Sequence, residues 1–197
     1  MYRLALIFIL IVIFGNINGQ MPQCYSSILP SQVIVSVNPY VKLDTKDIWP
    51  LDGNGTYLQK ISAKAKGKKF NFYVSLTISP YMLEAVAFND FNGWLYTLRL
   101  TPENLVWEES KQIPSIMQPE NIIADFLLVH IPMMKLQTAL HGARALEKGN
   151  EKRKARIVNF DKVIRKIQYK EPIGTMWGHV IITNPRKYRL DIQTAVQ

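Results

Sequence analysis

Hydrophobic and polar residues alternate one for one through the stretch KFNFYVSLTI, residues 69–78. The apolar side chains on one side of this stretch are Phe70, Phe72, Val74, Leu76 and Ile78. Side chains of a β-strand point alternately to its two faces, so this period of two predicts a strand with one dry face and one wet face. The dry face needs cover, which can be a second sheet, a helix or a bound molecule that is not protein.

The same alternation recurs along most of the chain. Together with the first stretch it predicts strands over residues 56–66, 69–78, 83–88, 94–101, 105–109, 155–160, 163–169, 179–183 and 187–195. Short turns separate most of these strands, and Asn92-Gly93 is a dipeptide typical of tight hairpin turns. Strands joined by short turns form antiparallel sheets. The predicted fold class is α+β, a curved and half-open antiparallel β-barrel of about nine to eleven strands.

The hydrophobic period changes after Pro119, a typical first residue of a helix. In the run IIADFLLVHI that begins at Ile122, apolar residues are spaced as on one face of a helix. Pro132 interrupts this pattern, and a second helical segment follows over 133–140. These segments are too apolar to lie outside, so we expect two or three helices that cover the concave face of the sheet. About twenty helical residues cannot cover the whole face, which predicts a partly open apolar cavity.

The N-terminus has the layout of a secretory signal peptide. A cationic head at Arg3 precedes an apolar run over 4–14, and a small polar segment ends at Gly19. The run is shorter than the ~20 apolar residues of a membrane-spanning helix. We therefore expect an exported protein. The expected organisation is a signal peptide at 1–19, an N-terminal tail and linker at 20–55, and a half-barrel domain at 56–197.

Cys24 is the only cysteine, which excludes an intramolecular disulfide and a cluster of metal-binding thiolates. It lies shortly after the expected cleavage site, where a lipid-modified cysteine would stand. The preceding residues Met21-Pro22-Gln23 lack the aliphatic and small residues that lipid-modifying machinery prefers. Two alternatives therefore stay open, a lipid anchor at Cys24 or an unmodified thiol in the N-terminal tail.

The chain is basic, with a formal net charge of +9 at pH 7. Two clusters of basic residues lie at predicted turns: Lys64, Lys66, Lys68, Lys69, Lys152, Arg153 and Lys154. For an exported protein we expect these clusters to meet the anionic head groups of a membrane surface, and we expect no nucleic acid partner. The alternative is that both clusters are solvated loops.

Groups typical of an active site are few. The sequence has no Gly-x-Ser-x-Gly elbow, no His-Glu-x-x-His pair and no glycine loop for phosphate. Its three histidines are widely separated, so neither a metal nor another cofactor is expected. Asp125 stands in an apolar helix and is expected either to form a buried ion pair with Arg156 or Arg144, or to face solvent. The protein is therefore not expected to be an enzyme.

A set of residues in the helical segment and the C-terminal strands matches a known pattern. They are Ile122, Ile123, Ala124, Asp125, Leu128 and Pro132, followed by Arg156, Ile167, Tyr169, Trp177, Gly178, Tyr188, Leu190, Ile192 and Thr194. With them the chain resembles a family of bacterial envelope lipoproteins of unknown function, often encoded beside aryl polyene lipid genes. That family is similar in architecture to the lipoprotein carrier LolA and the outer-membrane receptor LolB, half-open barrels whose apolar cavity takes acyl chains.

This resemblance implies a protein of the periplasm, or of the periplasmic face of the outer membrane, that holds an acyl lipid or a lipidated protein without covalent chemistry. We expect a monomer. The residues expected to line the lipid cavity are Phe70, Phe72, Val74, Leu76, Trp94, Tyr96 and Leu98, with Met133 and Met134 on the lid. Two other functions stay open, a structural or scaffolding envelope protein with a filled core and a protein partner, and a hydrolase that acts on lipid.

Overall fold

The computed structural model describes residues 33–196, apart from residues 92, 112, 114–117, 151–153, 174–175 and 186. The predictions that concern the signal peptide, Cys24, Asn92, Lys152 and Arg153 fall outside the described residues. In the part of the chain that the structure describes, no helix is long and apolar enough to cross a membrane.

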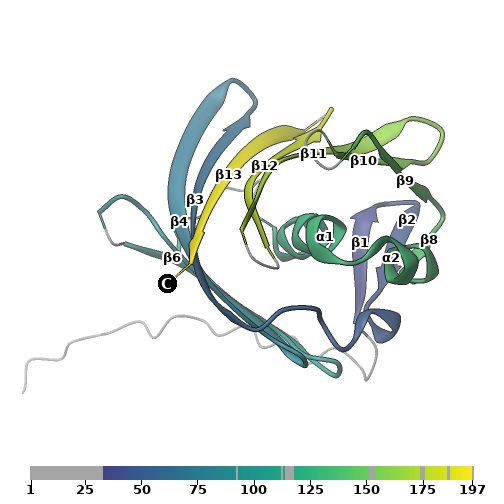
Figure 1. The fold of residues 1–197 in the computed structure, drawn as a ribbon. Coiled ribbons are helices and arrows are strands. Elements are labelled where there is room, and N and C mark those ends of the chain that lie inside the picture. The colour runs from purple at the N-terminus through teal and green to yellow at the C-terminus, as the bar shows by residue number, and fades with distance from the viewer. Residues whose placement is uncertain are drawn as a thin grey trace, which may run out of the picture.

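Strands in the described residues form one large antiparallel sheet of ten strands in the order β7-β6-β5-β4-β3-β13-β12-β11-β10-β9. Their bounds are β3 Gly55–Ala65, β4 Lys68–Ser79, β5 Met82–Phe88, β6 Trp94–Leu100, β7 Leu105–Glu109, β9 Arg144–Lys148, β10 Ala155–Asn159, β11 Val163–Ile173, β12 Met176–Asn184 and β13 Tyr188–Val196. The sheet curves around a helix and leaves β7 and β9 as unpaired edges (Figure 1). The predicted α+β fold with a half-open barrel is confirmed.

Two helices, α1 Pro119–His130 and α2 Met133–Ala139, connect the halves of this sheet. A small sheet, in the order β1-β2-β8, lies on the other side of α1 from the large one (Figure 1). Its strands are β1 Ile34–Asn38, β2 Val41–Asp44 and β8 Leu140–His141. Helix α1 packs against β1, so α1 is held between the concave face of the large sheet and the small sheet.

The small sheet includes part of the segment that the sequence analysis assigned to a tail and linker, residues 20–55. Residues 34–38 and 41–44 are strands, and Lys46–Ile48 is a short 3-10 helix, η1. Val33, Val35 and Val37 are buried in the core. Strands this short give only two or three alternations, too few for the period of two to predict them.

The hairpin of β3 and β4 has the expected alternation. Phe72, Val74, Leu76 and Ile78 are all at least 95% buried, and residues between them face outward. The two strands are joined by Lys66 and Gly67, both with positive φ (47° and 77°), as a two-residue turn of type I′ requires.

The alternation breaks at the start of β6. Ala87 of β5 pairs with Tyr96, but the next residue, Phe88, pairs with Trp94, so Leu95 is an extra residue in β6. A bulge of this kind changes which face the preceding side chain takes. Tyr96 faces the concave side, whereas Trp94 shares the outer face with Phe88 and donates its Nε1 hydrogen to Thr97 Oγ1 at 3.1 Å.

Candidate functional site

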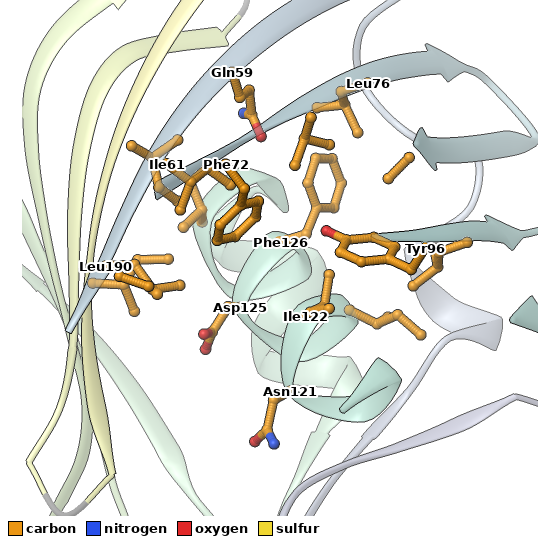
Figure 2. Close-up of a pocket in the computed structure, with 18 of the residues that line it drawn as sticks. Gln59, Ile61, Phe72, Leu76, Tyr96, Asn121, Ile122, Asp125, Phe126 and Leu190 are labelled. Atoms are coloured by element: carbon orange, nitrogen blue, oxygen red, sulfur yellow. The ribbon is translucent and has the colours of Figure 1, made fainter. Parts of the chain in front are cut away.

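An apolar cavity of about 100 Å³ lies between α1 and the concave face of the large sheet (Figure 2). The apolar and aromatic residues around it are Ile61, Ala63, Phe72, Val74, Leu76, Leu83, Ala85, Tyr96, Leu98, Ile122, Ile123, Phe126, Val129, Ile182, Leu190 and Ile192. The more polar residues at its margin are Gln59, Asn121, Asp125, His130 and Tyr188. The cavity surface is almost entirely apolar.

Five of the residues expected to line a cavity do so: Phe72, Val74, Leu76, Tyr96 and Leu98. They occupy inward positions of β4 and β6, where the period of two is regular.

Four others do not line the cavity. Phe70 is the third residue of β4 and is half-buried against the core. Trp94 is on the outer face because of the bulge at Leu95. Met133 packs against the core at the start of α2, and Met134 is 84% exposed. Helix α2 packs on η1 and the small sheet, which is why its methionines do not reach the cavity.

Residues of β3, β13 and α1 also line the cavity, and none of them was among the residues predicted from the sequence to line it. Ile61 and Ala63 of β3 pair with Ile192 and Leu190 of β13, so residues far apart in the chain form one continuous surface. On α1, the residues at the cavity run from Asn121 to His130, and Ile122, Phe126 and Val129 among them are spaced three or four residues apart, as on one face of a helix. The alternation of apolar residues shows which side chains of a strand face inward, but it does not show that β3 pairs with β13.

Asp125 forms a buried ion pair, and its partner is Arg165 instead of Arg156 or Arg144. Arg165 Nε donates to Asp125 Oδ1 at 2.7 Å, and the Tyr188 hydroxyl donates to Oδ2 at 2.5 Å. Burial raises the pKa of Asp125, while Arg165 and Tyr188 stabilise its charged form. Because both oxygens of the carboxylate are bonded, this group fixes the middle of α1 to β11 and β13.

Arg156 has a different role, at the C-terminal end of α1. Its Nη1 donates to the carbonyl oxygens of Leu128 and Ile131 at 2.5 and 2.9 Å, and its Nη2 lies 2.6 Å from Glu147 Oε1. The last carbonyls of a helix have no partner within it, and a guanidinium satisfies them well. Arg156 therefore lies about one and a half turns along α1 from Asp125, too far along the helix to be its partner.

His130 is the last residue of α1 and its ring lies 4.6 Å from that of Phe126. Burial and the positive charge of Arg156 lower the pKa of His130 from 6.5 to about 3. The imidazole is therefore neutral in the folded protein near pH 7.

The low pKa of His130 predicts a loss of stability in mild acid. Below pH 6.5 the unfolded chain binds a proton at this histidine and the folded protein does not, so the free energy of unfolding falls as pH falls. Between pH 7.5 and 5 we expect wild type to lose about 2 kcal/mol more than His130→Gln. Urea unfolding of both proteins across this pH range measures the difference, and equal slopes would contradict a neutral imidazole in the folded protein.

The basic clusters differ in their surroundings. Lys64, Lys66, Lys68 and Lys69 are exposed at the tip of the β3–β4 hairpin, whereas Lys154 forms an ion pair with Glu147 at 2.9 Å.

Among the described residues no three histidine, cysteine or acidic side chains gather to hold a metal ion.

Comparison with known proteins gives a family and little more. No curated protein matches the chain. A crystal structure of a DUF1329 family protein from Desulfovibrio piger is similar at 11% sequence identity and a TM-score of 0.32, over 73% of this chain and 85% of that one; a similarity at this TM-score carries no inference. The family model described as a protein of unknown function, DUF3261, matches residues 56–196. Since this match spans both halves of the large sheet and α1, the chain belongs to the DUF3261 family.

Proposed function

We propose that the protein binds an acyl chain of a lipid or a lipidated protein, reversibly and without covalent chemistry, in the cavity between α1 and the large sheet. The observation that carries the proposal is an unfilled space of about 100 Å³ whose surface is almost entirely apolar. Water gains few hydrogen bonds in such a space, and apolar cavities of similar size, ~150 Å³, stay dry and bind small hydrocarbons. A segment of a hydrocarbon chain has the matching size and chemistry.

The cavity also makes binding favourable from the protein's side. Side chains around an unfilled apolar space lack contacts on one side, which costs stability. A ligand that fills the space restores the lost contacts of its walls. A structural or scaffolding protein has no need to retain this cost, so the cavity favours a binding function over that alternative. In this proposal the protein is not an enzyme and uses no cofactor.

The remaining parts of the proposal rest on the sequence. A half-open barrel with a helix in its concave face is the architecture expected by resemblance to LolA and LolB, and the N-terminal residues suit export. We therefore propose that the protein works in the periplasm or at the periplasmic face of the outer membrane, where it holds acyl chains during transfer or insertion.

Titration with a fluorescent fatty-acid probe tests the binding function. We expect saturable binding with one site per chain, and competition by unlabelled lipids with long acyl chains but not by their head groups alone. Native mass spectrometry of protein purified from cell envelopes provides a second measurement, in which an acyl lipid is expected to copurify. A protein that neither binds the probe nor carries lipid would contradict the proposal.

The exposed lysines of the β3–β4 hairpin support a further part of the proposal, contact with an anionic membrane surface. Each lysine near such a surface contributes about 1 kcal/mol. Replacing Lys64, Lys66, Lys68 and Lys69 with glutamine is therefore expected to weaken binding to phosphatidylglycerol-containing vesicles more than tenfold. Vesicle sedimentation at low and high salt measures this affinity.

A matched control removes the same charge elsewhere. Lys42, Lys46, Lys166 and Lys170 are also exposed, and their replacement with glutamine is expected to weaken vesicle binding much less. Equal losses in both variants would mean that net charge alone, and not the hairpin, determines the interaction.

A further inference from the structure

The polar side chains at the cavity differ in whether they have hydrogen-bond partners within the protein. Gln59 Nε2 donates to Thr194 Oγ1 at 3.3 Å, and Asn121 Oδ1 accepts from Arg165 at 3.5 Å. The Tyr188 hydroxyl donates a hydrogen bond to Asp125 Oδ2. Within the described part of the chain, Tyr96 and His130 are the cavity residues whose polar side-chain atoms have no hydrogen-bond partner.

Tyr96 is the more informative of the two because it stands on the wall of the cavity with the rest of its side chain packed. It is only 1% exposed, and its ring stacks on Trp107 with 4.7 Å between centroids and 24° between planes. Figure 2 shows its hydroxyl oxygen directed toward α1, into the space between helix and sheet. A polar group at an apolar surface gains free energy from a hydrogen-bond partner, and a hydroxyl on the cavity wall is within reach of a ligand there.

The ring has little freedom to turn its hydroxyl elsewhere. Tyr96 follows the bulge at Leu95, and its backbone is paired with Ala87 on one side and Glu109 on the other. Trp107 is itself fixed, because its Nε1 donates to Glu109 Oε2 at 2.8 Å. These contacts hold the ring, and with it the hydroxyl, in one orientation.

The charges around the cavity restrict what can pair with this hydroxyl. Burial raises the pKa of Tyr96 well above its ordinary value of 10, so the phenol stays neutral. His130 is neutral too, and the positive charge of Arg165 is matched by Asp125. No cationic side chain lines the cavity within the described residues, so a buried carboxylate or phosphate would lack a counter-charge.

We propose that the cavity prefers an acyl chain that carries an uncharged oxygen substituent along its length, such as a hydroxyl or keto group, and that the Tyr96 hydroxyl bonds to it. The inference rests on the proposed acyl-chain binding and adds the class of chain. An aliphatic chain alone fills the apolar space but leaves the phenol unpaired, whereas a substituted chain satisfies both.

A series of methyl stearates tests the preference. The ligands are methyl stearate and its derivatives with one hydroxyl at successive positions from C7 to C14, measured by displacement of a fluorescent fatty-acid probe. Esters are used so that no ligand carries a charge. We expect wild type to bind at least one derivative about fivefold more tightly than methyl stearate, the factor that one net hydrogen bond supplies, with a maximum at one position.

Tyr96→Phe keeps the ring and its contact with Trp107 and removes only the oxygen. This variant is expected to bind methyl stearate within twofold of wild type and to show no preference for the hydroxylated derivative. Tyr73→Phe, on the outer face of β4, is the matched control and is expected to keep the full preference.

Each outcome separates the two proposals. If wild type does not bind methyl stearate or any derivative, acyl-chain binding itself is wrong and the preference falls with it. If wild type binds methyl stearate and every derivative equally, or if the preference persists in Tyr96→Phe, then acyl-chain binding stands and the assignment to Tyr96 is overturned. Because the wild-type series alone can show a lack of preference, the test does not depend on the folding of a variant.

Discussion

Arg165→Met is expected to lower the free energy of unfolding by about 3–5 kcal/mol. The substitution leaves the Asp125 carboxylate buried, 4% exposed, without the guanidinium that lies 2.7 Å from it. An unpaired buried charge is far more costly than a lost surface interaction. Equilibrium urea unfolding, followed by circular dichroism, measures the change.

Two further variants make this expectation specific. Arg99 and Glu84 form an ion pair on the outer face in which the arginine side chain is 55% exposed, so Arg99→Met is expected to cost less than about 1 kcal/mol. The double variant Asp125→Leu with Arg165→Met removes both charges and is expected to recover a large part of the loss. If Arg165→Met costs no more than Arg99→Met, the buried pair does not fix α1.

Ala85→Leu is expected to weaken binding of the fatty-acid probe at least tenfold without loss of stability. Ala85 lines the cavity from β5, and the added carbon atoms occupy space that the ligand would otherwise take. Filling an existing void adds contacts without forcing neighbours apart, so the free energy of unfolding is expected to stay the same or rise. Probe titration and urea unfolding of the same preparation give both numbers.

Ala87→Leu is the matched control. Ala87 faces the same side of β5 two residues further on, is fully buried and does not line the cavity. Added volume there has no space to enter, so we expect a loss of about 1–3 kcal/mol with probe affinity retained. Normal probe binding by Ala85→Leu would mean that the ligand binds elsewhere.

The alternation of apolar residues was sufficient to predict the large sheet and the inward face of β4. It fails where a single residue is added. Period-two reasoning places Trp94 on the same face as Tyr96, but Leu95 is an extra residue and turns Trp94 outward. Because a bulge is a local change in pairing with the neighbouring strand, nothing in β6 alone reveals it.

The sequence predicted that Asp125 can form a buried ion pair, but it did not identify Arg165 as the partner. Arg165 alternates with the buried residues Ile167 and Tyr169, so the parity of β11 puts a charged group on the inward face. Arg156 has the same inward parity in β10. Which of the two arginines lies level with Asp125 depends on how α1 is placed along the sheet, and that placement is set by tertiary packing.

The side-chain hydrogen bonds that hold α1 all come from one part of the large sheet. Arg156 of β10, Arg165 and Tyr169 of β11, and Tyr188 of β13 bond to the helix, the tyrosine of β11 through the Val129 carbonyl at 2.8 Å. In the described residues, no side-chain hydrogen bond joins α1 to the strands from β3 to β7. Within the described residues, the side-chain hydrogen bonds of α1 to the large sheet are thus made with β10–β13, whereas β3–β6 face α1 across the largely apolar cavity. Under the proposed function, an acyl chain that enters between α1 and the β3–β6 strands meets no side-chain hydrogen bond between them in the described residues. The cavity can then widen on that side while the hydrogen bonds of α1 to β10–β13 stay intact.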